Sequence, residues 1–461
     1  MGVFTLFFKI RKKVYLGRMV NVTIKGLLCW IILLPAAAYA QDAQVFVPHQ
    51  AKYRDDVILP NISSSQVMED SLISFYQAWK TKYLKRDDCV GDGLYVLFDE
   101  GEKNKKCVSE GQGYGMVIVA YMAHWDLSAR ATFDSLFAYY KENRVKNPHD
   151  PDTTFAYLMS GCQSKDCRNK KCGKKGGDAA TDGDLDIAYA LLLADAQWHG
   201  KSNVNYAQEA QNIMAAILRK EINDKSFTIL KGNAVEKPNE RDPKDPGSPD
   251  YFDMRPSDFM PAHFKIFERK FSNAAWGKVT DTCYKLFETL QHQQASVGSG
   301  LVPDFVVDVH SPKPAWPYYE ETKDDGRYAH NACRVPWRVA TDYIINGDPR
   351  SKAFVDTINR WVVRQTQGSI DNFSEGYNLD GTPIGGGTTN SPVLSFICPF
   401  AVAAMVDSKY QAWLNTLYRY IVDYRIDPPK REKDKSKYDY YNNTIKMYTM
   451  IILTGKYWVP E

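Results

Sequence analysis

The most informative stretch of the chain is ATDGDLDIAYALLLADAQW, residues 180–198. From Ile187 onward its apolar residues recur with the period of an α-helix. The glycine turn at its start carries aspartates at alternate positions, including Asp182 and Asp184. The helix therefore begins almost at once, with these two residues in its cap and first turn. One aspartate there is a common helix cap, and a second leaves a carboxylate free to hydrogen-bond a ligand.

Alternate aspartates also resemble a calcium-binding loop. An EF-hand needs further oxygen ligands and a bidentate glutamate at the twelfth position of the loop. Leu193 and Gln197 stand near that position, and neither can supply the carboxylate. We therefore interpret the stretch as a helix entry and expect no metal site.

Similar helix-period segments follow one another along most of the chain. Strand-like alternation is sparse and is mainly confined to residues 93–98 and 302–309. Polar loops rich in glycine and proline separate the segments, notably 231–250 and 368–390, and loops of this length are typically functional or disordered. The pattern predicts one all-α domain of about a dozen helices, closed by long loops at one end. The periodic segments are 72–83, 116–125, 133–140, 187–198, 207–218, 273–290, 354–366, 399–406, 412–426 and 441–453.

A second informative stretch, SEGQGYGM at residues 109–116, places Glu110 before three alternate glycines and an apolar helix. A glutamate at such an entry can be covered by an aromatic side chain and partly desolvated, which keeps it protonated near neutral pH. A protonated carboxyl is what a general acid needs. The structural alternative is that the helix dipole simply favours Glu110 at the helix N-terminus.

The N-terminus has the pattern of a secretory signal peptide. Basic residues precede an apolar run at 26–35, and Ala38-Tyr39-Ala40 supplies the small residues of a cleavage site. The run is too short to span a bilayer comfortably. We expect residues 1–40 to be removed after Ala40, although Met19 is an alternative start. An extended leader over 41–66 and a single domain over 67–461 would remain, secreted or periplasmic and without a membrane span.

Composition narrows the class of protein further. The 461 residues include 58 basic and 55 acidic ones, and a net charge of +3 is too weak to recruit nucleic acid. The 10 Trp, 29 Tyr and 21 Phe residues suit either an aromatic core or a groove whose rings stack on sugars. In an oxidising compartment we expect disulfides between Cys89 and Cys107 and between two of the three cysteines at 162, 167 and 172.

Taken together, the two stretches resemble glycoside hydrolase family 8. Residues 180–198 match the diagnostic pattern of that family, and the segment around Glu110 resembles its general-acid motif. The resemblance covers roughly residues 70–455. It includes the further blocks RPSDFMPAHF at 255–264, GLVPD at 300–304 and NACRVPWR at 331–338.

This resemblance implies an (α/α)6 barrel of about twelve helices with a substrate groove at one end. It also implies inversion at the anomeric carbon, which needs an acid and a base roughly 6.5–9.5 Å apart and no cofactor. Glu110 takes the place of the general acid. Asp182 matches the carboxylate that holds the sugar at the cleavage point, and Asp184 either orders the turn or contacts substrate.

The general base departs from the commonest pattern of the family. Asn331 stands where many members have an aspartate, and an amide cannot accept a proton. A second subfamily, which contains chitosanases and some glucanases, has this asparagine and uses a glutamate of the preceding loop. We expect Glu320 to be the base, with Glu321 as the alternative, and we interpret Asp324 and Asp325 as solvated loop charges.

Several further residues are expected to support this centre. Arg334 and Arg338 would brace its carboxylates by bidentate pairing. His263 lies on an apolar stretch and is expected to be a satisfied core residue rather than a proton shuttle. The candidates for stacking on sugar rings are Tyr114, Tyr251, Trp316, Tyr319 and Trp337.

The sequence thus predicts a monomeric, endo-acting, inverting hydrolase of a β-1,4-linked polysaccharide. The pattern at Asn331 favours chitosan or a β-glucan over xylan. One alternative is an endo- or exo-acting member of the same family that cleaves xylan. Another is a carbohydrate-binding protein on a degenerate hydrolase fold, for which the missing aspartate at position 331 is the supporting feature.

Overall fold

The computed structural model describes residues 47–98, 105–145, 156–166, 172, 178–239, 244, 246–384, 393–426 and 439–460. The predicted signal peptide and its cleavage site lie outside these residues. From Val45 onward the chain forms one compact unit. None of the helices in the described ranges combines the length and the apolar character that crossing a membrane requires.

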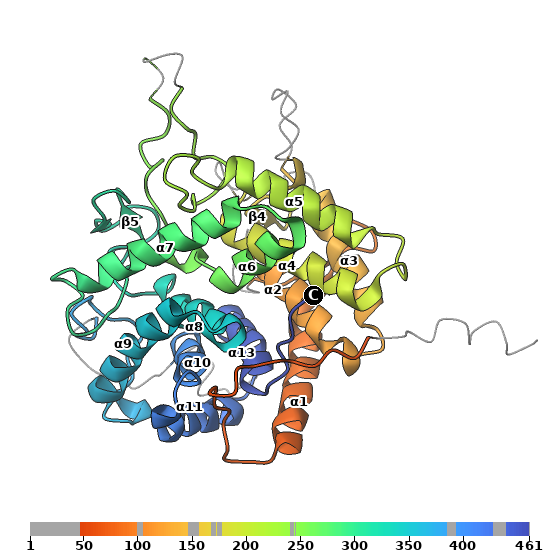
Figure 1. Ribbon diagram of the computed structural model, residues 1–461. Helices are drawn as coiled ribbons and strands as arrows, with labels where there is room; N and C mark the ends of the chain where they lie inside the picture. The colour runs from red at the N-terminus through yellow and green to blue at the C-terminus, as the bar shows by residue number, and fades with distance from the viewer. Residues whose placement is uncertain are drawn as a thin grey trace, which may run out of the picture. The chain divides into compact units, whose positions relative to one another are not determined.

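Twelve α-helices make up the described fold, and along the chain they alternate between an outer and an inner position (Figure 1). The outer helices are α1 (Ser65–Tyr83), α3 (Ala129–Glu142), α5 (Tyr206–Lys220), α7 (Ala275–His292), α9 (Pro349–Thr366) and α11 (Gln411–Asp423). The inner helices are α2 (Ser109–Tyr121), α4 (Thr181–Trp198), α6 (Pro261–Phe271), α8 (Val335–Asn346), α10 (Leu394–Ala404) and α13 (Asp439–Leu453). This arrangement is an (α/α)6 barrel, and it confirms the expected fold class.

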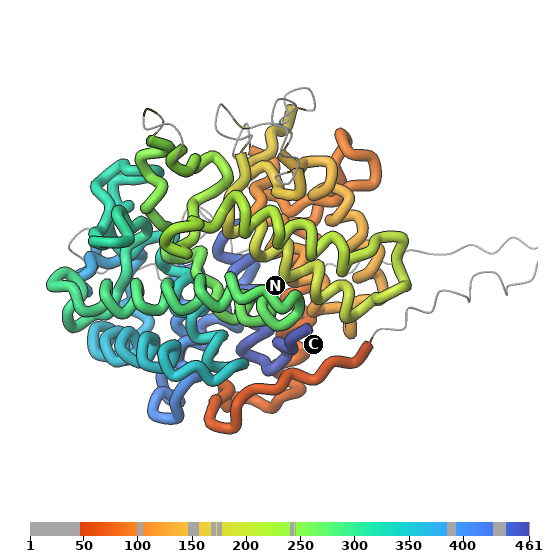
Figure 2. Tube along the Cα trace, turned by 45° about the horizontal axis from the view of Figure 1, so that its top comes forward, coloured from red at the N-terminus to blue at the C-terminus, as the bar shows by residue number. Residues whose placement is uncertain are grey.

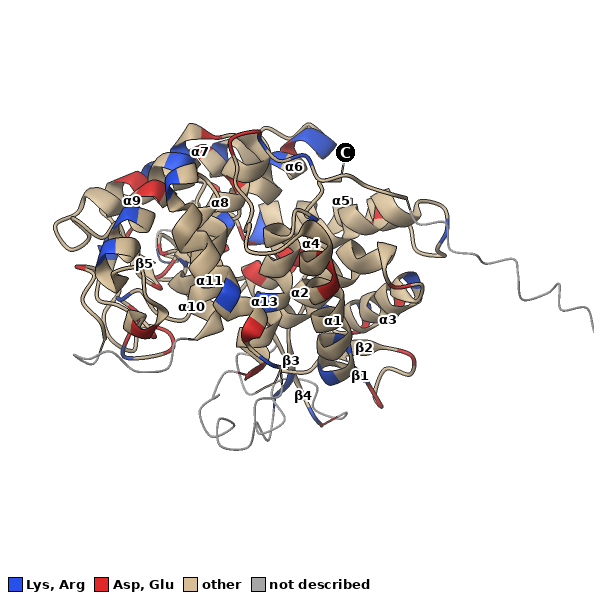
Figure 3. Ribbon diagram, turned by 90° about the horizontal axis from the view of Figure 1, so that it is seen from below, with Lys and Arg blue, Asp and Glu red and all other residues tan. Residues whose placement is uncertain are grey.

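The distribution of buried residues on each helix distinguishes the inner from the outer helices. Every residue of α10 is buried, and α4 is buried except at Asp195 and Ala196, as expected for helices surrounded by protein on all sides. The outer helix α5 instead buries one stripe, which includes Ala210, Ile213 and Ile217. Charged residues of both signs are interspersed along the outer helices α7 and α9 (Figure 3).

The path of the chain gathers the starts of the inner helices at one end of the barrel. Helices α2, α4, α6, α8 and α10 each pack against the outer helix that follows them, so the chain returns before the next inner helix begins. The six inner helices therefore run in the same direction. Their N-termini, with unpaired N–H groups and the positive ends of the helix dipoles, meet at the same end.

Three short antiparallel ribbons occur in the described loops. They pair β1 (Leu84–Arg86) with β2 (Leu94–Val96), β3 (Lys105–Val108) with β4 (Cys162–Ser164), and β5 (Val306–Val307) with β6 (Lys313–Pro314). The ten periodic segments of the sequence all fall on helices, whereas α6 and α8 were not recognised. Helix α8 buries all but two of its residues.

The described part of the expected leader crosses the other end of the barrel (Figure 2). Arg54 N donates to Ile344 O at 3.2 Å, and Ile58 N donates to Met405 O at 2.9 Å. The Tyr53 hydroxyl donates to Ile452 O at 2.9 Å. These carbonyls belong to the last turns of α8, α10 and α13, which lack partners within their helices. These hydrogen bonds attach the segment to the ends of the inner helices.

The disulfides differ in part from the expectation. Cys162 is bonded to Cys172, as the spacing allowed. The predicted pair of Cys89 and Cys107 is wrong, because Cys107 is a free, fully buried thiol, whereas Cys89 is disulfide-bonded. Cys107 lies on β3 with its side chain against the core, where its Sγ is 3.5 Å from Gln112 Oε1. Successive side chains of a strand point to opposite faces, and the neighbouring Lys106 is the residue that reaches Cys89, with its Nζ 3.7 Å from Cys89 Sγ.

Candidate active site

A single arginine joins the two carboxylates at the starts of α2 and α4. Arg334 ends the 3₁₀ turn η5 (Ala332–Arg334) in front of α8, and only 1% of it is exposed. Its Nη1 donates to Glu110 Oε2 at 2.6 Å and to Asp182 Oδ2 at 2.7 Å. Both carboxylates come from the first turn of an inner helix, so the shared direction of these helices creates the cluster.

Glycines allow α2 and α4 to approach closely at this point. A Cβ atom on Gly183 would lie 2.5 Å from the carbonyl carbon of Ser109 and 2.7 Å from Glu110 N. A Cβ atom on Gly113 would lie 2.9 Å from Gly183 O. Both clashes are with backbone atoms, which cannot move aside. The glycines on either side thus place Glu110 next to Asp182.

Tyr440, in the first turn of α13, covers Glu110. Its hydroxyl lies 3.5 Å from Glu110 Oε1, and a Cβ atom on Gly111 would collide with the same hydroxyl. The sequence indicated an aromatic cover over Glu110 but not which residue supplies it. Tyr440 stands 330 positions away from Glu110, and no local pattern connects the two.

The environment separates the ionisation of the two carboxyl groups. Burial raises the pKa of Glu110 to about 7, although Arg334 partly opposes this. Burial acts in the same direction on Asp182, but Arg255 and Arg334 outweigh it and lower its pKa to about 2. Near neutral pH one group can hold a proton while its neighbour is a carboxylate, which is how paired acids take different roles.

Residues of the 255–264 block complete this network. Arg255 Nη2 lies 3.5 Å from Asp182 Oδ1, and Arg255 Nε lies 3.0 Å from Asp258 Oδ1. Ser257 Oγ accepts from Arg334 Nη2 at 2.7 Å. In the sequence this block stood out only as part of the family resemblance, and no local pattern marks Arg255, Ser257 or Asp258 individually.

Asp325 shapes the acidic loop. Its carboxylate, 1% exposed, accepts the backbone N–H groups of Glu320 at 2.7 Å, Glu321 at 2.9 Å and Thr322 at 2.8 Å. The expectation that Asp325 is a solvated charge is therefore wrong, because it replaces the backbone partners that the loop lacks. Asp324 instead pairs with Arg327 Nη1 at 2.8 Å.

The two glutamates of this loop point to different neighbours. Glu320 Oε2 pairs with Lys231 Nζ at 2.9 Å, and Lys231 also donates to Tyr319 OH at 2.9 Å. Glu321 Oε2 accepts from Asn331 Nδ2 at 2.8 Å, and Asn331 Oδ1 accepts from Arg334 Nη2 at 2.9 Å. Hydrogen bonds thus connect Glu321, through Asn331, to the arginine that holds Glu110 and Asp182.

Other predicted residues lie beneath this centre. Asp184 is fully buried, and its Oδ1 accepts from Met159 N at 2.8 Å, so it orders the neighbouring segment. Arg338 was expected to brace the carboxylates of the site but pairs with Asp186 inside the barrel, with Nη1 3.1 Å from Oδ1. His263 Nε2 lies 3.2 Å from the same oxygen of Asp186. His263 is therefore a hydrogen-bonded core residue, as expected.

The predicted aromatic residues separate into two groups. Tyr114, Tyr251 and Trp337 are buried and present no open ring face. Trp316 is 59% exposed, and its ring meets Tyr319 edge-on at 5.0 Å between centroids. Tyr319 is partly exposed. Of the five candidates, Trp316 and Tyr319 are the ones whose rings a ligand could contact.

A twelve-helix barrel with paired carboxyl groups of separated pKa at one end is consistent with a glycoside hydrolase. The chain belongs to glycosyl hydrolases family 8, whose sequence profile matches residues 47–455. It is 34% identical over 429 residues to a beta-glucanase of Niallia circulans, covering 93% of this chain and 94% of that protein. It is 33% identical over 430 residues to an endoglucanase of Bacillus sp. (strain KSM-330), covering 92% and 84%.

Among solved structures, the chain is similar to the apo form of a beta-1,3-1,4-glucanase from Paenibacillus sp. X4. The TM-score is 0.76 at 33% sequence identity, and the match covers 89% of this chain and 97% of that one. The similarity thus extends over nearly the whole barrel.

Proposed function

We propose that the protein is an exported, endo-acting, inverting hydrolase of a β-linked glucan. The relatives named beta-glucanase and endoglucanase support a glucan over chitosan or xylan as substrate. The observation that carries the mechanism is the bridge from Arg334 to both Glu110 and Asp182. The signal-peptide pattern supports export, and N-terminal sequencing of the mature protein should then begin at Gln41.

Glu110 acts as the general acid. Its raised pKa leaves it protonated at mildly acidic pH, and it donates this proton to the glycosidic oxygen as the bond breaks. Asp182 is ionised under the same conditions. Its negative charge stabilises the positive charge that develops on the sugar ring at the cleavage point.

Glu321 acts as the general base, in place of Glu320, which the sequence favoured. Glu320 is engaged in an ion pair with Lys231. The amide of Asn331 donates to Glu321 and orients its carboxylate, while the carbonyl of the same amide faces Arg334. Glu321 then takes the proton of a water molecule that attacks the anomeric carbon from the face opposite Glu110, and the configuration inverts.

Reducing-sugar release on barley β-glucan, carboxymethyl-cellulose, chitosan and xylan tests the substrate. The first two polymers should be cut, and NMR of the earliest product should show the inverted anomer. Cleavage of xylan alone would support the xylan-acting alternative. If no polymer is cut, the protein is a carbohydrate-binding member of the family.

Three matched variants test the catalytic roles. Glu110→Gln and Glu321→Gln should each lose roughly 10²–10⁴-fold in kcat, whereas Glu320→Gln should keep activity within a few fold. Azide should partly rescue Glu321→Gln, since it attacks without a base. A substrate with a dinitrophenolate leaving group should rescue Glu110→Gln, because that group departs without a proton. If Glu320→Gln loses activity and Glu321→Gln keeps it, Glu320 is the general base.

A further inference from the structure

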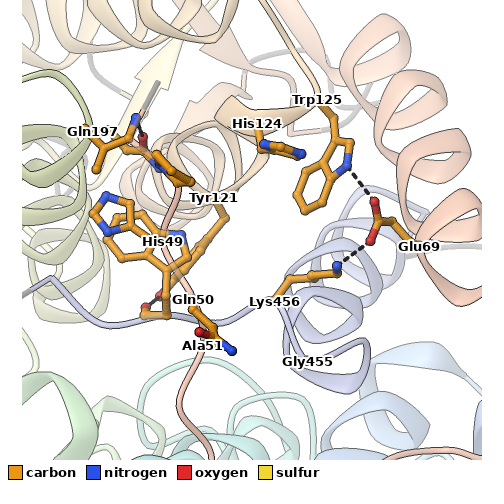
Figure 4. Close-up of a pocket in the computed structure, with 13 residues that line it drawn as sticks. His49, Gln50, Ala51, Glu69, Tyr121, His124, Trp125, Gln197, Gly455 and Lys456 are labelled. Atoms are coloured by element: carbon orange, nitrogen blue, oxygen red, sulfur yellow. Dashed lines mark hydrogen bonds and ion pairs between the residues drawn. The ribbon is translucent and has the colours of Figure 1, made fainter. Parts of the chain in front are cut away.

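A pocket of about 340 Å³ opens at the end of the barrel opposite Glu110 and Asp182 (Figure 4). Residues 47–51 and the turn after α13 form part of its lining, together with the last turns of α2 and α4. Its two walls comprise Glu69, Trp125 and Lys456 on one side and His49, Gln197 and Trp458 on the other.

Helix length separates this pocket from the catalytic end. Tyr121, which lines the pocket, is the last residue of α2, and Glu110 is the second residue of that helix. At a rise of about 1.5 Å per residue the two positions lie roughly 16 Å apart along the axis. Gln197 and Asp182 stand roughly 22 Å apart along α4 by the same measure. A ligand in this pocket cannot reach the reacting atoms.

Glu69 holds the first wall in place. Its Oε1 accepts the indole N–H of Trp125 at 2.9 Å, and its Oε2 pairs with the Lys456 ammonium. That ammonium lies 5.4 Å from the centre of the Trp125 ring. The orientation of Trp125 is therefore set before any ligand binds, and the charges of Glu69 and Lys456 neutralise each other.

The second wall is aromatic and polar. His49 stacks on Trp458, with ring centroids 3.8 Å apart and an angle of 16° between the planes. Burial lowers the pKa of His49, which keeps this ring neutral at pH 7. Gln197 also lines the pocket, and its Oε1 accepts from Val47 N at 3.3 Å.

This combination selects a neutral, polar ligand. A free anion would meet Glu69 and a free cation would meet Lys456, so neither gains from the wall charges. Flat rings together with fixed hydrogen-bonding groups suit the apolar faces and hydroxyl edges of sugars. The volume lies at the lower end of the range for small-molecule sites, roughly 300–1,000 Å³.

We infer that this pocket binds a neutral saccharide, namely a short stretch of the glucan that the catalytic end cleaves. The choice of glucan rests on the proposed function, whereas the site itself rests on the pocket. Binding at the far end would keep the enzyme on its polymer and raise the local concentration of cleavable chain.

Calorimetric titration of the Glu110→Gln protein with cellotriose tests the inference without turnover. Two binding events are expected, and Trp125→Ala in the same background should remove one or weaken it at least tenfold. Ala51→Phe should have the same effect, because Ala51 lines the pocket and a larger side chain would fill it while leaving the wall contacts intact. Leu127→Ala is the matched control, since Leu127 is 80% exposed and lies outside the lining.

A binding event that persists unchanged in both Trp125→Ala and Ala51→Phe overturns the inference. Hydrolysis of the four polymers by the wild type is read separately. If none is cut while cellotriose binding still depends on Trp125 and Ala51, the pocket stands and the proposed function fails. If glucan is cut but cellotriose binds at one site that neither substitution affects, the proposed function stands and the pocket is not a saccharide site.

Discussion

The ionisation of Glu110 predicts where activity is lost as pH rises. Burial raises its pKa from the ordinary 4.5 to about 7, which favours the protonated form by about 3 kcal/mol. A general acid works only when protonated, and with this pKa about 90% of the enzyme is active at pH 6 but about 10% at pH 8. Hence kcat/KM on barley β-glucan should fall roughly tenfold over this interval.

The fall of kcat/KM with rising pH forms the alkaline limb of the pH profile. Replacing Arg334 should move this limb to higher pH. The guanidinium stabilises the Glu110 carboxylate, so Arg334→Gln should raise the pKa of Glu110 further. A cation at such a distance changes a carboxyl pKa by roughly 1–3 units. The limb should therefore shift to higher pH by about that amount, even though the rate itself falls because Asp182 also loses a partner.

The assay is initial release of reducing ends at low substrate concentration from about pH 4 to 10. Circular dichroism at each pH checks that the protein stays folded. Arg327→Gln is the matched control, because Arg327 pairs with Asp324 on the loop and should leave the limb in place. An unchanged limb in folded Arg334→Gln, or a shift to lower pH, would refute this account of Glu110.

Three further predictions follow from other contacts. Asp325→Asn should lower kcat on β-glucan about 10-fold or more with little change in KM, because the loop loses its acceptor, whereas Asp324→Asn should behave as wild type. Arg338→Met should lower the free energy of unfolding, measured in urea, by about 3–5 kcal/mol, because it leaves the buried Asp186 carboxylate without its arginine partner. Gly183→Ala should cost about 1–3 kcal/mol by the same measurement and reduce activity, since its Cβ would collide with backbone; wild-type stability and rate would contradict the close packing of α2 and α4.

The local sequence was enough to predict the helical architecture and two carboxylates of the candidate site, Glu110 and Asp182. Helical periodicity and caps depend on residues within a few positions of each other, so ten of the twelve helices could be recognised from the chain alone. Glu110 and Asp182 became candidates for the same reason, because each stands in a glycine-rich helix entry, whereas the resemblance to family 8 supplied their expected roles. Helices α6 and α8 were not recognised, and both begin in blocks that had been noted only for the family resemblance.

Tertiary structure decided which side chains meet. Arg334 contacts Glu110 across 224 positions of sequence and Asp182 across 152. The divergence of Glu320 from Glu321 depends on Asp325 and Asn331 of the same loop region and on Lys231, which stands 89 positions from Glu320. Cys107 likewise faces the core as a free thiol, although its spacing from Cys89 had suggested a disulfide between them. In an irregular loop the orientation of a side chain depends on contacts with residues far away in the sequence, and the local sequence does not reveal those contacts.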